Sequence, residues 1–191
     1  MAIEEPDYEV IQQEDDLEIR RYASFVIAET LVDDVDSRGA ASNQGFRRLF
    51  GYISGENKVR EKIEMTAPVI QATAETSGEK IAMTAPVQQT RTDGGWLVAF
   101  VLPLHYTLAT APLPADTRIS LREVTPRTMA VLRFSGRWSD KNIEKHRQEL
   151  VERLEEKDIR MLGKMEFAAY NAPFALPFMR RNEVMVEIDG S

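Results

Sequence analysis

Period-2 alternation of apolar and polar residues predicts two β-hairpins in separate parts of the chain. The first lies between residues 17 and 27 and follows a short strand at Tyr8 and Val10. The second lies between residues 119 and 134. Their alternating apolar positions are Leu17, Ile19, Phe25 and Ile27 in the first hairpin, and Ile119, Leu121, Ala130, Leu132 and Phe134 in the second.

A helical pattern follows each hairpin. A helix is predicted over residues 37–53, because apolar residues recur there at i, i+3, i+4 and i+7, although Gly45 weakens its first turns. A second helix is predicted over residues 140–156, with Ser139 or Asp140 as its N-cap. The apolar stripes consist of Phe46, Leu49, Phe50 and Ile53 on the first helix, and Ile143, Leu150 and Leu154 on the second.

The order of elements predicts an internal duplication. Further strands follow both helices, at residues 96–102 after the first and at 165–169 and 184–188 after the second. The halves, about 8–102 and 115–188, therefore share the order hairpin, helix, strands, displaced by about 101–103 positions. Each unit alone would expose an apolar sheet face that pairing buries. We predict a single α+β domain over residues 1–191 with a pseudo-two-fold axis.

One ten-residue phrase occurs twice. Residues 61–70 and 79–88 are identical at eight of ten positions, and both contain Met-Thr-Ala-Pro-Val. Each copy alternates like a strand and runs into a proline, and a small, polar segment separates the copies. We expect a long hairpin from Ile63 to Val87 that closes a groove between the halves. An accidental duplication of an edge-strand sequence is the alternative.

Composition narrows the classes of partner. The 191 residues have 43% hydrophobic and 29% charged content, which is typical of a soluble globular protein. The net charge of −7 disfavours nucleic acid and anionic membranes, since phosphate binding relies on clustered Lys and Arg. No apolar run approaches the roughly 20 residues of a membrane span. The acidic N-terminus predicts a cytoplasmic protein, or a periplasmic one if a leader has been removed.

Catalytic signatures are absent from the sequence, so we expect a protein that is not an enzyme. No cysteine is present, and no HExxH, GxSxG or phosphate-loop motif occurs. The two histidines are His105, in a proline-rich loop, and His146, beside the apolar face of the second predicted helix. His105 is the candidate metal or haem-iron ligand. Its alternative role is that of an ordinary exposed loop residue, and His146 is expected to pack.

Apolar binding has more support. Methionine is abundant and adapts to irregular apolar shapes or broad flat ligands, although it also fills gaps in ordinary cores. The loop Leu176-Pro177-Phe178-Met179 directly precedes Arg180 and Arg181. Apolar side chains beside guanidinium groups suit a hydrophobic ligand that carries carboxylates. A loop that folds onto the sheet, with an arginine paired to Glu183, is an equal alternative.

Three motifs together resemble the SOUL haem-binding protein family. They are the two Met-Thr-Ala-Pro-Val phrases, the Phe-Val-Leu-Pro-Leu-His-Tyr-Thr stretch at residues 100–107, and residues 170–184, which include Arg-Arg-Asn-Glu-Val. The resemblance covers nearly the whole chain, from about Tyr8 to Ile188. It implies a distorted β-barrel flanked by two helices, similar to bacterial effector-binding domains. It also implies non-covalent binding of haem or another tetrapyrrole in a shallow apolar pocket beside the first helix.

The resemblance also implies which residues face the ligand. They come from the first helix, the repeated phrase and the late loop, and are Phe46, Leu49, Phe50, Ile53, Met65, Met83, Phe178, Met179 and Arg180. No histidine precedes His105, so the iron ligand that some members place before this helix has no counterpart here. The leading hypothesis is a tetrapyrrole carrier, buffer or sensor. The alternative is a domain that binds a small-molecule effector or a protein without haem.

Overall fold

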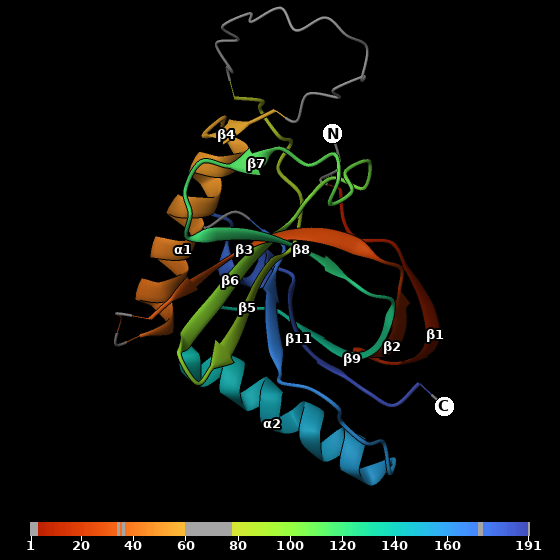
Figure 1. Cartoon of the computed structure of the whole chain (residues 1–191). Helices are drawn as coiled ribbons and strands as arrows, with labels where there is room; N and C mark the ends of the chain where they lie inside the picture. The colour runs from red at the N-terminus through yellow and green to blue at the C-terminus, as the bar shows by residue number, and fades with distance from the viewer. Residues whose placement is uncertain (1–3, 34, 36, 60–77, 172–173, 191) are drawn as a thin grey trace, which may run out of the picture.

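The computed structural model describes residues 4–33, 35, 37–59, 78–171 and 174–190. Within them lie two α-helices, eleven strands and one short 3-10 helix (Figure 1). In chain order they are β1 (Tyr8–Glu14), β2 (Leu17–Tyr22), β3 (Phe25–Val32), α1 (Arg38–Ile53), β4 (Asn57–Lys58), β5 (Val87–Thr92), β6 (Gly95–Val101), β7 (Leu113–Pro114), β8 (Ile119–Val124), β9 (Arg127–Phe134), α2 (Asp140–Glu156), β10 (Glu166–Ala169), η1 (Pro177–Met179) and β11 (Asn182–Glu187).

Both predicted helices are confirmed, and a serine cap marks the residue at which each begins. The Ser37 hydroxyl accepts a hydrogen bond from the Ala40 amide at 3.2 Å at the start of α1. The Ser139 hydroxyl accepts one from the Asn142 amide at 3.3 Å at the start of α2. Each bond satisfies one of the amides that a helix leaves without a partner at its first turn.

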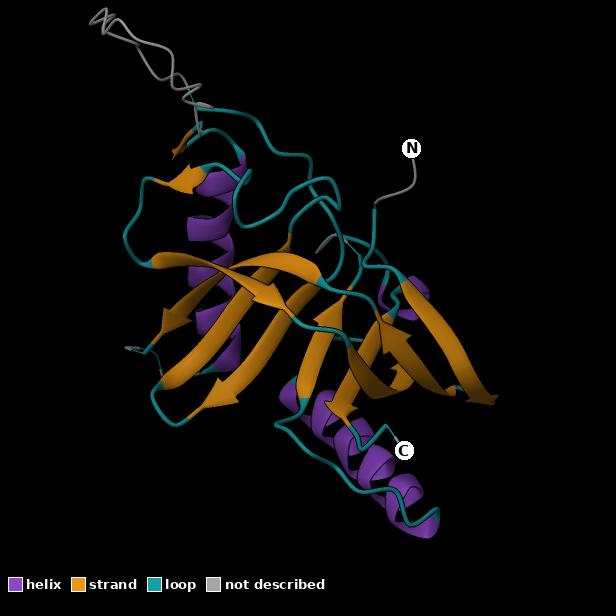
Figure 2. Cartoon of the chain, turned by 45° about the vertical axis from the view of Figure 1, so that its right-hand side comes forward, coloured by secondary structure: helices purple, strands orange, loops and turns teal. Residues whose placement is uncertain are grey.

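Nine strands form one antiparallel sheet in the order β1-β2-β9-β11-β10-β5-β6-β3-β8, and β4 pairs with β7 separately. Figures 1 and 2 show that the large sheet curls into a half-barrel with both helices on its outer side. Helix α1 packs on β3 and β6, and α2 packs on β9 and β11. The predicted α+β fold with a distorted barrel and two flanking helices is therefore confirmed.

The two predicted hairpins are wrong in their pairing. Strand β2 pairs with β9 rather than β3, and β8 pairs with β3 rather than β9. Leu17 lies opposite Leu132 in the first pair of strands, and Phe25 lies opposite Val124 in the second. In both pairs the numbers of opposite residues sum to 149, so one register continues from β2·β9 into β3·β8. Residues 17–32 and 119–134 therefore form two long, bent ribbons paired with each other. Pro126 lies at the bend, where it supplies no amide to the ladder.

The two ribbons give the fold its internal repetition. Strands β2 and β8 begin at residues 17 and 119, β3 and β9 at 25 and 127, and α1 and α2 at 38 and 140, each 102 positions apart. The centre of the sheet has the same symmetry. Strands β5 and β10 pair with each other there, and on their other sides β5 pairs with β6 beneath α1 while β10 pairs with β11 beneath α2. We interpret this order as a duplicated unit.

The core has three parts because the curled sheet has two apolar faces. One cluster lies under α2 and another under α1, and the third lines the concave face. Alternation along β9 shows the division, since Ala130 and Leu132 face α2 while Met129 and Val131 face the concave side. This concave cluster includes Tyr22 and Tyr170, whose hydroxyl groups lead into a buried polar network.

The second copy of the repeated phrase departs from the predicted strand. Strand β5 begins only at Val87, and residues 79–86 form no ladder. Their amides bond elsewhere: that of Ile81 to the Ile53 carbonyl at 2.8 Å, and that of Ala85 to the Glu4 carbonyl at 2.9 Å. The first copy, including Met65, lies outside the described residues, as does the part of the predicted long hairpin before residue 78; the described second arm is not a strand before Val87.

Close approach of α1 to the sheet gives a prediction for stability. A Cβ at Gly45 would lie 2.6 Å from the Val98 Cβ, whereas one at Gly39 would meet nothing within 4 Å. We expect Gly45→Ala to lower the free energy of unfolding by about 1–3 kcal/mol through overpacking. Gly39→Ala should leave it unchanged or raise it slightly, because alanine favours a helix. Urea unfolding measures both; equal midpoints would contradict the close packing.

Candidate functional site

A groove runs along α1 between the helix and the late part of the chain. It consists of two adjoining hollows of about 300 and 220 Å³. Both are lined by Phe46, Val87, Ala169 and Asn171, so they form one continuous surface depression. Their combined extent reaches the range of small-molecule sites.

The first hollow is the more polar end of the groove. It begins at the N-terminus of α1 and reaches the loop before β11. Its further lining residues are Arg38, Gly39, Ser42, Asn43, Gln89, Trp138 and Arg180. The second hollow is the apolar end, and its further lining residues are Phe50, Met83, Thr84, Ala85, Tyr170 and Phe174.

Only half of the predicted stripe on α1 faces this groove. Phe46 and Phe50 line it, and their rings stack with centroids 5.9 Å apart. Leu49 and Ile53 instead lie in the core cluster beneath the helix. Positions three apart on a helix differ by about 60° in direction, so a four-residue stripe spans both the core and its rim. The outward pair is the part of the stripe that lines the groove.

The other predicted residues have mixed positions. Met83 lines the apolar end, and Arg180 lines the polar end. Phe178 and Met179 are exposed on the 3-10 helix but line neither hollow. His105 lies in a separate loop, where its ring contacts that of Tyr106 at a centroid distance of 4.1 Å.

The polar end contains groups that the sequence did not single out. The Arg38 guanidinium donates to Asp140 at 2.7 Å, to the Gln89 side-chain oxygen at 3.0 Å and to the Trp138 carbonyl. Arg180 lies 4.4 Å from the centre of the Trp138 ring. Apart from Arg180, which was predicted from the sequence, no sequence signal marks these residues, because they come from four separate segments. Together they place two guanidinium groups beside the apolar groove.

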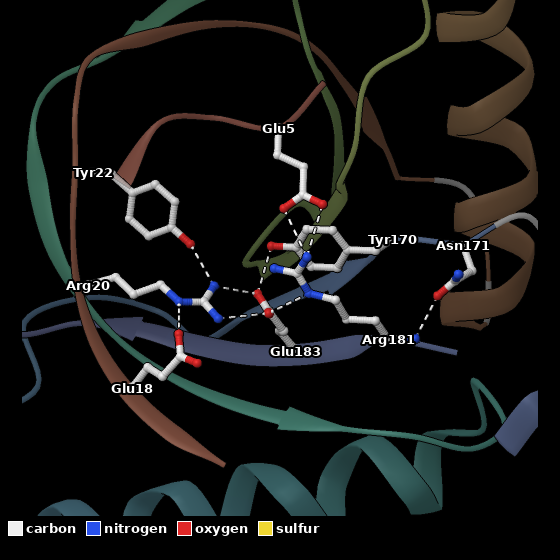
Figure 3. Close-up of polar contacts among 8 residues, drawn as sticks. All are labelled: Glu5, Glu18, Arg20, Tyr22, Tyr170, Asn171, Arg181 and Glu183. Atoms are coloured by element: carbon white, nitrogen blue, oxygen red, sulfur yellow. Dashed lines mark hydrogen bonds and ion pairs between the residues drawn. The ribbon is translucent and has the colours of Figure 1, made fainter. Parts of the chain in front are cut away.

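A buried charge network lies directly behind the groove wall (Figure 3). The Glu183 carboxylate accepts two hydrogen bonds from Arg20, both at 2.9 Å, one from the Tyr170 hydroxyl at 2.6 Å and one from Arg181 at 3.0 Å. The Arg181 amide donates to the Asn171 side chain at 2.6 Å. Since Tyr170 and Asn171 line the groove, the network fixes the orientation of its wall.

Electrostatics keep this network charged. Burial by itself raises the pKa of Glu183, but hydrogen bonds from Arg20 and the charges of Arg20 and Arg181 outweigh it and hold that pKa below its ordinary value. Burial, together with the adjacent carboxylate, raises the pKa of Tyr170 well above its ordinary value. Tyr170 is therefore a hydroxyl donor to a carboxylate throughout the physiological range.

Comparison with known proteins identifies the family. The model of the SOUL heme-binding protein family matches residues 3–187, nearly the whole chain. The chain belongs to the SOUL haem-binding protein family. The resemblance seen in the sequence motifs is thereby confirmed. No curated protein matches the sequence.

Several solved structures share the fold of this SOUL protein. A hydrolase from Listeria innocua is 11% identical, with 94% of each chain covered and a TM-score of 0.54. The EcmrR C-terminal domain is 9% identical, with 96% of this chain and 99% of that chain covered and a TM-score of 0.56. EcmrR in a DNA complex is 6% identical, with 92% and 57% covered and a TM-score of 0.61. At these identities the likeness concerns the fold alone.

The groove of this SOUL protein fits the apolar ring and the acidic groups of haem better than its iron. Phenylalanine and methionine side chains line one end, and arginine lies at the other. The described residues contain no cluster of three or more His, Cys, Asp or Glu that could hold a metal. Among the described residues lining the groove, Met83 offers a thioether, a soft donor, and none is a histidine. No helix in the described part of the chain could cross a membrane.

The charge of Glu183 gives a prediction for acid stability. Because its pKa is lower in the folded chain, its contribution is fully present above the unfolded value near 4.5 and is lost as pH falls through the folded pKa. Glu183→Gln should lower the unfolding free energy at neutral pH by about 3–5 kcal/mol, since Arg20 loses its buried partner. It should also reduce the pH dependence of stability below about pH 4.5.

Chemical unfolding of wild type and variant across this acidic range makes the test. Glu187→Gln, on the same strand but outside the network, is the matched control and should keep the wild-type pH profile. An unchanged profile for Glu183→Gln would show that the network does not stabilise the fold through charge.

Proposed function

We propose that the groove along α1 binds haem or another tetrapyrrole, and that the protein acts as a carrier, buffer or sensor of that ligand. The observation that carries this proposal is the pairing of an apolar wall with an arginine-bearing end in a chain of the SOUL family. A tetrapyrrole with propionate groups has the same division between a flat apolar ring and a charged edge.

Each end of the groove has its own role in this proposal. Phe46, Phe50 and Met83 contact the ring and exclude water from it, which stabilises the complex by about 25 cal/mol per Å² of apolar surface buried. Arg180 and Asn171 lie at the polar end, where a guanidinium and an amide can donate to carboxylates. Haem, when bound, would supply its own redox and ligand-binding chemistry, while the protein supplies orientation and a dry surface.

The apolar end is tested by titration with hemin, followed by visible absorption. Phe50→Asp should weaken binding by about tenfold or more, because it places a charge against the ring. Leu162→Asp, at an equally exposed apolar position near the end of α2, should bind like the wild type. Unchanged binding by Phe50→Asp would remove the groove as the site.

The same titration with metal-free protoporphyrin tests coordination. Equal affinity for both ligands would mean that no protein atom bonds the iron. If Met83 does so, Met83→Leu weakens hemin binding alone and leaves protoporphyrin binding unchanged.

The polar end is tested with a second ligand pair, protoporphyrin and its dimethyl ester. Arg180→Gln should reduce affinity for the diacid by about tenfold, the value of a hydrogen bond to a charged group, and leave affinity for the ester nearly unchanged. Equal losses for both ligands would mean that Arg180 supports the loop rather than a carboxylate.

A second candidate function is binding of another amphipathic anion, as in an effector-binding domain. Arg38, Gln89 and Asn171 favour it, since they add polar groups to the first hollow that the second hollow has in smaller number. A groove that is stabilised against heat by other amphipathic acids, and is indifferent to both porphyrins, would support this candidate over the first.

A further inference from the structure

The loop from Phe174 to Met179 presents large apolar side chains to solvent. Phe174 is 91% exposed, Phe178 73%, Met179 66% and Leu176 55%. Single exposed apolar residues are common, but four within six positions form a patch of the kind that marks an interaction surface. The loop also borders the groove, because Phe174 lines its apolar end and Arg180 follows at its polar end.

This loop is held in place rather than left to collapse onto the sheet. The Gly136 amide donates to the Pro177 carbonyl at 2.9 Å, and the Arg180 guanidinium donates to the Ala175 carbonyl at 2.9 Å. Residues 177–179, which precede Arg180, form the 3-10 helix η1. Because the backbone is tied at both sides, the exposed side chains are presented outward at a small further cost in conformational entropy.

Charge is distributed unevenly around the loop. The chain has 31 acidic residues, yet none lies in residues 38–55, 80–92 or 167–182, the three segments that supply most of the groove lining. The same segments carry several cations, among them the exposed Arg47 one turn from Phe50. Carboxylates of other segments pair with two of these cations, Asp140 with Arg38 and Glu5 with Arg181. The Arg47 guanidinium instead donates to the Asn43 carbonyl of its own helix and stays exposed. At physiological ionic strength charges farther than about 8–10 Å are screened, so Arg47 acts locally despite the net charge of −7.

We propose that this face docks on the surface of an anionic lipid bilayer. Phe174, Phe178 and Met179 enter the boundary between headgroups and acyl chains, and Arg47 contacts lipid phosphate or carboxylate groups. Exposed apolar side chains together with an exposed cation match such a surface, whose acyl chains are apolar and whose headgroups are negative. The net charge of the chain disfavours an anionic membrane, but the exposed Arg47 and the acid-free segments that line the groove favour one for this face.

The bilayer is favoured over a protein partner by the shape and charge of the patch. The four side chains are more than half exposed and, except for Phe174, line neither hollow, whereas protein hot spots cluster in packed pockets. The proposal stands without bound tetrapyrrole, although the groove opens beside the same face and a membrane-dissolved ligand would enter it there.

Vesicle flotation of the ligand-free full chain tests the proposal. The protein should float with vesicles of phosphatidylcholine plus phosphatidylserine and much less with phosphatidylcholine alone. Phe178→Asp should lower the partition coefficient by about tenfold or more, from the lost insertion of a ring. Arg47→Glu should lower it by at least about fivefold on anionic vesicles only.

Leu162→Asp is the matched control, since Leu162 is 49% exposed and follows the far end of α2. It should float like the wild type, and circular dichroism melts should agree for all variants. Failure of the wild type to float, or equal flotation of Phe178→Asp and wild type, overturns the proposal; the latter result leaves a protein as the loop's partner. Hemin binding is measured in a separate titration, so a failure of membrane docking can be distinguished from a failure of the proposed tetrapyrrole binding.

Discussion

The continuous pairing of residues 17–32 with residues 119–134 is the constraint on which the fold depends. One register runs through both ribbons, so the position of the first half fixes that of the second. The bend at the middle of each ribbon sends its two strands to opposite sides of the sheet. Each ribbon therefore contributes side chains to the core beneath both helices: Leu17 and Ile19 of β2 join the cluster under α2, and Ile119 of β8 joins the cluster under α1.

The buried network of Glu183 connects this scaffold to the groove. Arg20 belongs to the first ribbon and Glu183 to β11, and Tyr170 directly follows β10, so the carboxylate joins three parts of the sheet. Its four donors are all supplied by the chain. A fully satisfied buried carboxylate of this kind fixes geometry more than it adds stability. The wall formed by Tyr170 and Asn171 is correspondingly well defined before any ligand arrives.

Much of the fold could be predicted from the sequence because the relevant signals are local. The 3.6-residue period and the serine caps define α1 and α2, and alternation marks most strands. The pairing of strands could not be predicted, because alternation indicates that a segment is a strand but does not indicate which strand lies next to it. The phrase at residues 79–88 shows the same limit: its pattern fits a strand, but its amides bond to α1 and the N-terminal segment.

The candidate site was predicted only in part for a related reason. A stripe on a helix identifies a buried side, yet separating Phe46 and Phe50 from Leu49 and Ile53 requires knowing how the sheet is placed beneath the helix. Of the polar end only Arg180 was predicted, because Arg38, Gln89, Trp138 and Asn171 converge only in the folded chain. Their segments are isolated from one another in sequence, and none carries a motif.

The displacement of 102 positions between the helices has a consequence for recognition. The counterparts of Phe46 and Phe50 on α2 are Gln148 and Glu152, which border a shallow, solvated depression. Two related helices thus support the same architecture, but only one retains aromatic side chains on its outer flank. The repeated order of elements therefore does not extend to the helix surfaces, since the flank of α1 that lines the groove is aromatic and the matching positions of α2 are polar or charged. A repeated scaffold is thus compatible with a single aromatic groove, which lies along α1.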